Sequence, residues 1–367
     1  MSPLMDILRR EIAERGILSF ARFMDLVLYC PKHGYYEKNR DNPGRRGDFY
    51  TSAGTGELFG QLLAWQFAEW LVELPRGAGG GQIVEAGAHD GRLAGDILSW
   101  LQTNRPGLFD QMEYWIIEPS PQRQVWQQET LKPFGTRIRW RARFGDVSSF
   151  TGSAADAKAR RFHGVIFSNE LLDAMPVHRY GWDAANKNWY EWGVALDGER
   201  FVWAKIRNPK FKNQNPELEP VLPDGYTIET CPAAEAWWQA AAGALGRGKL
   251  MTIDYGLAAD ELFSPARLRG TVRAYFRHQA SDDLLARVGE QDLTAHVNFP
   301  AIRKTGEAAG LSTESFQTQA QFLTQILAKA AKSGSLGEWG STLARQFQTL
   351  THPEHLGRAF RVLIQAR

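Results

Sequence analysis

Residues 82–93 read Gln-Ile-Val-Glu-Ala-Gly-Ala-His-Asp-Gly-Arg-Leu, and this stretch decides the fold class of the chain. The first five form a short apolar run typical of a buried strand, and residues 92–101 have helical spacing. Gly87 and Gly91 lie between them, where the backbone must turn tightly. The stretch therefore predicts a strand, a glycine-rich turn and a helix, with the turn at the sheet edge where ligands usually bind.

The same alternation continues along the chain. Further strands are expected at 113–117, 137–143, 164–168, 249–254, 313–318 and 360–364. Helices are expected at 57–74, 122–131, 301–309 and 319–332. Apolar strands that alternate with amphipathic helices predict an α/β fold with a parallel sheet and crossover helices.

Two features divide the chain. Pro75 and the glycine-rich residues 76–81 form a linker, so we expect an N-terminal helical segment over residues 1–76 and the α/β domain over 77–367. Residues 189–206 alternate polar and apolar side chains around Asp197-Gly198, which predicts an antiparallel hairpin. We therefore expect an inserted β-hairpin region at about 178–247.

Composition restricts the class of function. The net charge is +2, from 43 Lys and Arg against 41 Asp and Glu, which disfavours a dedicated nucleic-acid binder. Cys30 and Cys231 have no metal-ligand or disulfide-framework spacing, so we expect no metal and a reducing cytoplasm. No run approaches the ~20 apolar residues of a membrane span, and the N-terminus resembles an amphipathic helix rather than a signal peptide. The oligomeric state is left open.

The glycine loop is the first candidate site. Its glycines are spaced by four residues, whereas a dinucleotide fingerprint needs G-x-G-x-x-G, so NAD is disfavoured. Gly87 and Gly91 let a ligand approach the backbone, and Glu85 or Asp90 could receive an ammonium group. Glu118, which closes the second strand, could accept both ribose hydroxyls through its two oxygens. The alternative is an ordinary turn with a solvated Glu118.

Polar residues also follow the third and fourth strands. Asp146 could accept a hydrogen bond from an adenine amino group, and a turn-forming role is the alternative. Asn169 and Glu170 follow the fourth strand and should lie over the same crevice, with a plain helix cap as the alternative for Asn169. These positions, together with the loop, suit a cofactor that carries an amino-acid moiety and a ribose.

Several blocks together resemble the MidA-like methyltransferase family, from about residue 17 to residue 330. Seven blocks recur in order: residues 34–36, 47–52, 59–60, 169–178, 253–256, 270–275 and 292–299. The resemblance implies a Rossmann-like domain that binds S-adenosyl-L-methionine. It also implies kinship with the mitochondrial assembly factor of respiratory complex I, which methylates an arginine of a partner subunit.

The family loop usually has the form E-L-G-P-G-x-G, and this chain departs from it. Ala86, Ala88 and His89 replace its Leu, its Pro and its middle Gly. The His89 side chain could crowd the cofactor's carboxylate or bind it. The resemblance also places the block at residues 47–52 beside the active site.

We therefore expect an S-adenosyl-L-methionine-dependent methyltransferase that modifies an arginine of a protein partner, a respiratory-complex subunit being one candidate. A guanidinium is held best by carboxylates, because planar pairing fixes its orientation. Asp48, Glu170 and Asp173 are the candidate catalytic residues. The alternatives are a cofactor-binding assembly chaperone with little or no catalysis and a small-molecule methyltransferase.

Overall fold

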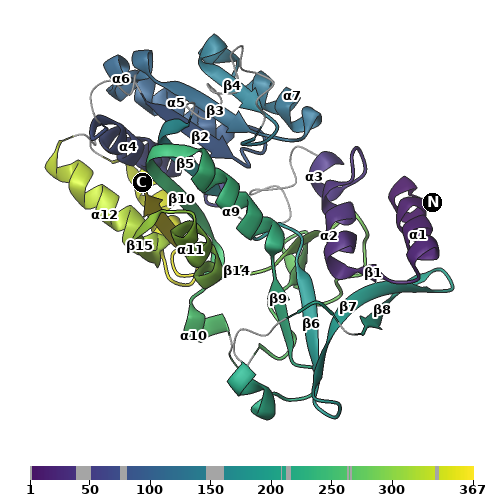
Figure 1. Cartoon of the computed structure of the whole chain (residues 1–367). Helices are drawn as coiled ribbons and strands as arrows, with labels where there is room; N and C mark the ends of the chain where they lie inside the picture. The colour runs from purple at the N-terminus through teal and green to yellow at the C-terminus, as the bar shows by residue number, and fades with distance from the viewer. Residues whose placement is uncertain are drawn as a thin grey trace.

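The computed structural model describes residues 2–38, 51–74, 81–145, 161–207, 209–211, 216–262, 264, 267–334 and 339–367. An eight-stranded sheet lies at its centre (Figure 1). Its strands are β2 (Gln82–Ala86), β3 (Glu113–Ile117), β4 (Ile138–Arg141), β5 (Phe162–Asn169), β10 (Leu245–Leu257), β14 (Val297–Asn298), β15 (Ser312–Thr318) and β16 (Phe360–Ala366). The order is β15-β16-β10-β5-β2-β3-β4, and β14 pairs with β10.

The expected parallel sheet is confirmed for the strands from β4 to β10. The terminal strand β16 differs, because it runs antiparallel to both β10 and β15. In the parallel part, Ala86 pairs with Ile117 on one side and with Ser168 on the other. The carboxyl ends of β2, β3 and β5 therefore meet at one edge, which brings together the loops that follow them.

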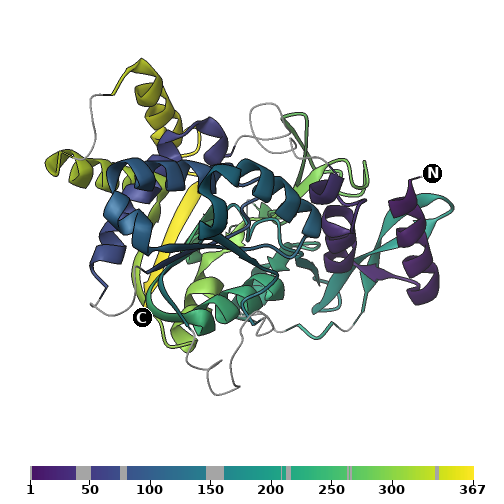
Figure 2. The same cartoon turned by 90° about the horizontal axis from the view of Figure 1, so that it is seen from above.

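Helices cover both faces of this sheet (Figure 2). One layer holds α4 (Leu58–Val72), α5 (Arg92–Asn104), α12 (Gln319–Lys332) and α13 (Ser341–Thr351), and the other holds α9 (Pro232–Ala244) and α11 (Phe299–Ala308). Ile83 and Val165 pack into the first layer, whereas their neighbours Val84 and Ile166 pack into the second. Successive strand residues point to opposite faces, so a strand buried on both sides is apolar throughout.

A second sheet packs with the N-terminal helices. It consists of β1 (Leu18–Ser19), β6 (His178–Asp183), β7 (Asn188–Asp197), β8 (Arg200–Ile206) and β9 (Thr227–Thr230). The expected hairpin is β7 and β8, which join through Gly198 at φ 58°. α1 (Pro3–Arg15) and α2 (Phe20–Tyr29) share a separate apolar core with this sheet. Figure 1 shows this assembly, called here the cap lobe, to one side of the central sheet.

Shorter elements complete the chain. They are α3 (Tyr35–Lys38), η1 (Ala53–Thr55), α6 (Pro106–Gln111), α7 (Pro121–Thr130), η2 (Lys132–Arg137), η3 (Pro216–Val221), α10 (Ala259–Leu262), β11 (Arg273–Phe276), β12 (Gln279–Ser281) and β13 (Asp292–Thr294). The last three strands form a small sheet that adds apolar side chains to the cap lobe.

The chain passes between the cap lobe and the central domain more than once. α1 and α2 belong to the cap lobe, whereas α4, also within residues 1–76, packs against α5 and β5 of the central domain. Within residues 178–247, α9 returns to the central domain. Among the described helices, none combines the length and the hydropathy that a membrane crossing requires.

Candidate active site

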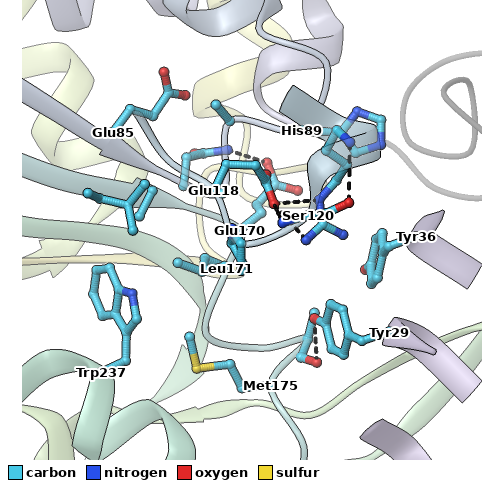
Figure 3. Close-up of a pocket in the computed structure, with 18 of the residues that line it drawn as sticks. Tyr29, Tyr36, Glu85, His89, Glu118, Ser120, Glu170, Leu171, Met175 and Trp237 are labelled. Atoms are coloured by element: carbon cyan, nitrogen blue, oxygen red, sulfur yellow. Dashed lines mark hydrogen bonds and ion pairs between the residues drawn. The ribbon is translucent and has the colours of Figure 1, made fainter. Parts of the chain in front are cut away.

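A cavity of about 710 Å³ lies at the carboxyl edge of the central sheet, a size typical of small-molecule sites. The loops after β2, β3 and β5 form its floor, and α2, α3 and α9 contribute its walls. Figure 3 shows Trp237 and Met175 on one side and Tyr29 and Tyr36 of the N-terminal segment on the other. The site therefore lies between the central domain and the cap lobe.

The glycine loop has the backbone conformation that its sequence requires. Gly87 has φ 77° and Gly91 has φ 85°, both in the left-handed region that favours glycine. A Cβ atom on Gly87 would lie 3.0 Å from Leu171 Cδ1, so the chain is closely packed there. His89 has φ 45°, and its carbonyl oxygen accepts a hydrogen bond from Gln127 Nε2 at 3.0 Å. A glycine at this position would take this conformation without strain.

The two acidic residues of the loop have different environments. Glu85 is buried and accepts a hydrogen bond from the Tyr114 hydroxyl at 2.7 Å, and burial raises the pKa of Glu85 to about 7. Asp90 accepts a hydrogen bond from the Arg92 backbone N–H at 3.1 Å and forms an ion pair with Arg92 Nε at 2.8 Å. Both residues line the cavity, so either carboxylate could meet a ligand's ammonium group.

Glu118 is buried at the cavity floor, which excludes the solvated-carboxylate alternative. It is 1% exposed. Its Oε1 accepts from the Ser120 backbone N–H at 2.9 Å and from Arg123 Nε at 2.9 Å, and its Oε2 accepts from Gln127 Nε2 at 3.0 Å. Sequence reasoning missed Ser120 and Arg123. Ser120 accepts a hydrogen bond from the Arg123 backbone N–H as the N-cap of α7, and a serine before a proline could have signalled that cap.

Asn169 and Glu170 emerge from the end of β5 into the cavity, as expected. Asn169 is not a helix cap, because no helix begins in the described stretch between β5 and β6; its Nδ2 donates to Glu170 Oε1 at 2.9 Å. The backbone N–H of Ser52 donates to the same oxygen at 2.9 Å. Within the described residues, Asn169 Oδ1 and Glu170 Oε2 are buried and have no hydrogen-bond partner. Burial of this kind is costly, so these two oxygens mark where a ligand's donor groups would bind.

The turn that presents Glu170 is fixed by a second carboxylate. Glu170 has φ 51°, and its backbone N–H donates to the Ile253 carbonyl oxygen at 2.9 Å. The buried Asp254 accepts hydrogen bonds from the backbone N–H groups of Leu171 at 3.1 Å and Leu172 at 2.8 Å. Such a left-handed residue persists only when its surroundings hold it, and it is a common feature of functional sites.

Asp173 lies behind the cavity surface rather than on it. Burial, followed by the nearby carboxyls of Asp254 and Asp292, raises its pKa well above the ordinary value. Asp173 and Asp254 also share a hydrogen bond, so one of the two carries a proton at neutral pH. Burial likewise raises the pKa of Glu170, to about 8, and Asp254 and Asp292 add to that shift. Several buried carboxyls therefore gather at this part of the cavity.

Another part of the cavity wall is apolar. Phe144 and Trp237 form an edge-to-face ring pair with centroids 5.6 Å apart, and Leu171 and Met175 lie beside them on the cavity wall. Such a surface suits a planar aromatic group. Trp237 comes from α9, a helix that the sequence reasoning did not predict. Asp48 and Asp146, two of the expected site residues, lie outside the described residues.

Residues 62–317 match the model of a family described as S-adenosyl-L-methionine-dependent methyltransferases. The chain belongs to this family. Two solved structures from Burkholderia thailandensis resemble the methyltransferase over 99% of its length. A COG1565 superfamily member bound to S-adenosyl-homocysteine is 32% identical, with a TM-score of 0.81 and 92% of that chain covered. A native structure from the same superfamily is 31% identical, with a TM-score of 0.78 and 91% of that chain covered.

Two curated relatives carry more specific names. The protein arginine methyltransferase NDUFAF7 homolog, mitochondrial, of Drosophila melanogaster is 27% identical over 97% of this chain and 83% of its own length. The mouse protein arginine methyltransferase NDUFAF7, mitochondrial, is 26% identical over 98% of this chain and 83% of its own length. The resemblance inferred from the seven sequence blocks is thus confirmed, as are the Rossmann-like fold and the cofactor class.

The residues of the cavity fit this cofactor. The glycine loop lines the cavity, the buried Asn169 Oδ1 needs a donor, and both aromatic side chains and carboxyls line the cavity. S-adenosyl-L-methionine has an ammonium group and two ribose hydroxyls, which can donate to carboxyls and to buried oxygens. Its adenine ring can pack against the aromatic side chains.

Proposed function

We propose that this methyltransferase transfers a methyl group from S-adenosyl-L-methionine to an arginine side chain of a protein partner. The observation that carries the proposal is Glu170, which lines the cavity and whose buried Oε2 has no hydrogen-bond partner among the described residues. A guanidinium donates paired N–H groups to a carboxylate and would satisfy that oxygen. The arginine methyltransferase names of the curated relatives support the same acceptor.

The cofactor would bind along the loops at the sheet edge. Glu85 or Asp90 receives its ammonium group, and the backbone at Gly87 and Gly91 lies against its amino-acid portion. Glu118 receives the ribose hydroxyls. Two further cofactor contacts are proposed from their positions, Asn169 after β5 and Asp146 at the adenine.

The acceptor would bind where the carboxyls gather. Glu170 contacts the guanidinium, Asp173 supports Glu170 from behind the cavity surface, and Asp48 is proposed as a further partner from its sequence block. An arginine stays protonated in water, so its nitrogen becomes an effective nucleophile only when it is held in line with the methyl group. The nitrogen forms a bond to the methyl carbon, the carbon–sulfur bond breaks, S-adenosyl-homocysteine leaves, and a nitrogen proton passes to a carboxylate or to water.

The test separates cofactor binding from catalysis. Proteins from cells that lack this chain are incubated with the enzyme and isotope-labelled S-adenosyl-L-methionine, and labelled arginines are located by mass spectrometry. Glu170→Gln should bind the cofactor within about threefold of wild type but lose at least about 100-fold in kcat/KM, equivalent to about 2.7 kcal/mol. Glu314→Gln, which removes a carboxylate paired with Lys249 near the other end of β10, should behave as wild type.

Each other outcome points to a different function. Label on a small molecule rather than on a protein would indicate a small-molecule methyltransferase. Cofactor binding without any labelled product would support the assembly-chaperone alternative. Normal methylation by Glu170→Gln would contradict the carboxylate clamp.

The partner and the compartment belong to the same proposal. A respiratory-complex subunit remains the candidate partner, and the expected cytoplasm rests on the two free cysteines, whereas the two curated relatives above are named mitochondrial.

A further inference from the structure

Arg123 joins two carboxylates that come from different lobes of the molecule. Its Nη2 and Nε contact Glu118 Oε1 at 2.8 and 2.9 Å, and its Nη1 contacts Glu37 Oε1 at 3.1 Å. The Ser120 hydroxyl donates to Glu37 Oε2 at 2.7 Å. The side chains of Arg123, Glu37 and Glu118 are only 11%, 9% and 2% exposed. These four residues, named here the bridge, form a polar network that is almost completely buried.

Glu37 is the contribution of the N-terminal segment to the bridge. It lies on α3, between two residues that form hydrogen bonds with the cap lobe. The Tyr36 hydroxyl donates to Asp292 Oδ1 at 2.8 Å, and Lys38 Nζ donates to the Gly289 carbonyl oxygen at 3.2 Å. Glu118 and Arg123 belong to the loop after β3 and to α7. The bridge therefore connects the cap lobe to the floor of the cofactor cavity.

The charges make this connection energetically significant. Burial would lower the pKa of Arg123, but Glu118 and Glu37 outweigh that effect and raise it. Removing one partner of a buried charge network is costly, because the remaining charges lose compensation that water cannot replace. Without Glu37, Arg123 would be free to reorient about Glu118, and the Glu118 carboxylate would lose its fixed direction.

The hydrogen bonds on Glu118 show which atom the bridge presents. Oε1 accepts from Ser120 and from two nitrogens of Arg123, which uses its acceptor capacity. Oε2 accepts from Gln127 and has capacity for a further donor. The bridge thus fixes one oxygen and leaves the other for a ligand.

We propose that Glu37 is a positioning residue for the cofactor. Through Arg123 it orients Glu118 toward the ribose hydroxyls, so that cofactor affinity depends on a residue of the N-terminal segment. The inference rests on the ribose role proposed above for Glu118. It requires that the effect of Glu37 on binding disappears when the ligand has no ribose hydroxyls, because a positioning residue acts only through the group that it positions.

The experiment compares two ligands by calorimetry: S-adenosyl-homocysteine and its analogue without the 2′ and 3′ hydroxyls. Glu37→Gln should weaken S-adenosyl-homocysteine about tenfold, as expected when one charge-assisted hydrogen bond is lost, and should weaken the analogue less than about twofold. Glu37→Asp, which keeps the charge on a shorter side chain, should show a smaller loss of the same pattern. Glu11→Gln is the matched control, because Glu11 pairs with Arg22 at 2.8 Å in the N-terminal segment and neither residue lines the cavity.

Two results would overturn the inference. Equal weakening of both ligands by folded Glu37→Gln and Glu37→Asp would show that Glu37 merely seats the cap lobe, and unchanged binding of both would show that it does not act on the cofactor. Glu118→Gln in the same assay tests the underlying assignment. If that variant weakens both ligands equally, the ribose role of Glu118 is wrong. If Glu118→Gln weakens S-adenosyl-homocysteine more than its analogue but Glu37→Gln does not, the ribose role of Glu118 stands and the inference about Glu37 fails.

Discussion

Gly87 and His89 show how single residues shape the cofactor loop. Both have positive φ, at 77° and 45°. At Gly87 the conformation and the nearby Leu171 side chain together demand glycine, because a Cβ atom would be strained and would lie 3.0 Å from Leu171 Cδ1. At His89 the conformation is strained for a side chain, and the carbonyl bond to Gln127 helps to hold it.

Replacing Gly87 by valine should abolish cofactor binding in a protein that still folds. A β-branched residue resists φ 77°, and its side chain would enter the space beside Leu171. We expect a loss of more than about 100-fold in affinity, equivalent to about 2.7 kcal/mol, measured by calorimetry with S-adenosyl-homocysteine. Circular dichroism would show whether the variant is folded, and unchanged affinity in a folded variant would exclude this loop as the cofactor site.

Glu118→Ala should affect both affinity and stability. We expect cofactor binding to weaken by ~1.5–3 kcal/mol, the range for a hydrogen bond to a charged group. The variant also leaves Arg123 with Glu37 alone, so its free energy of unfolding should fall by about 3 kcal/mol, as for a broken buried ion pair. Urea titrations of Glu118→Ala and of the more conservative Glu118→Gln would measure the second effect, and a binding loss below a few tenths of a kcal/mol would refute the ribose contact.

At the scale of elements, the ends of β5 and β10 place several carboxyls in one buried region. Asp254 near the end of β10 fixes the turn after β5, and that turn carries Glu170 and Asp173. Burial raises the pKa of Glu170 to about 8 and that of Asp254 to about 7. At neutral pH these groups are therefore partly protonated in the folded protein. In the unfolded chain they ionise near their ordinary pKa values.

This arrangement predicts that stability falls as the pH rises. The folded pKa of Glu170 lies above its unfolded value of 4.5, so its contribution is fully present below about pH 4.5 and is lost as the pH rises to about 8. Glu170→Gln cannot release this proton. Urea unfolding between pH 5 and pH 8 should therefore show that the free energy of unfolding falls less steeply with pH in the variant than in wild type. The difference in slope should correspond to about one proton. Identical slopes would mean that Glu170 is ionised in the folded protein.

For the whole molecule, the central feature is the cavity proposed to hold the cofactor, which is shared by two separately packed lobes. The cap lobe has its own apolar core around Leu8, Phe23 and Val194, and the central sheet has cores on both of its faces. Tyr29, Tyr36 and Glu37 reach the cavity from the cap side. A ligand that contacts both sides should therefore stabilise their association.

Hydrogen exchange should reveal this linkage. Adding saturating S-adenosyl-homocysteine should slow exchange in residues 20–38, by at least about threefold, because opening of the cap lobe then competes with ligand binding. Residues 341–351 of α13, which packs against α4 and α12 and does not line the cavity, should change much less. Equal protection of both segments would indicate a global effect rather than a linkage between cap and cofactor.

The sequence by itself determined several elements of the central domain. Strands β2 and β3 and helix α12 begin and end where the apolar pattern indicated, because local periodicity and flanking turn residues fix such elements. The acidic and glycine residues after those strands were expected at one edge of the sheet, because the carboxyl ends of parallel strands share that edge, and the structure places them there.

Only the tertiary structure decided how the cap lobe completes the site. No local sequence pattern pairs Glu37 with Arg123, or Ser52 with Glu170. The members of each pair are far apart in the chain and have no periodic relation. The strands β6 and β9 were missed because their pairing depends on distant partners rather than on their own sequence. The solvated Glu118 was wrong as an alternative for the same reason: its burial comes from side chains that meet it only when α3 and α7 pack together.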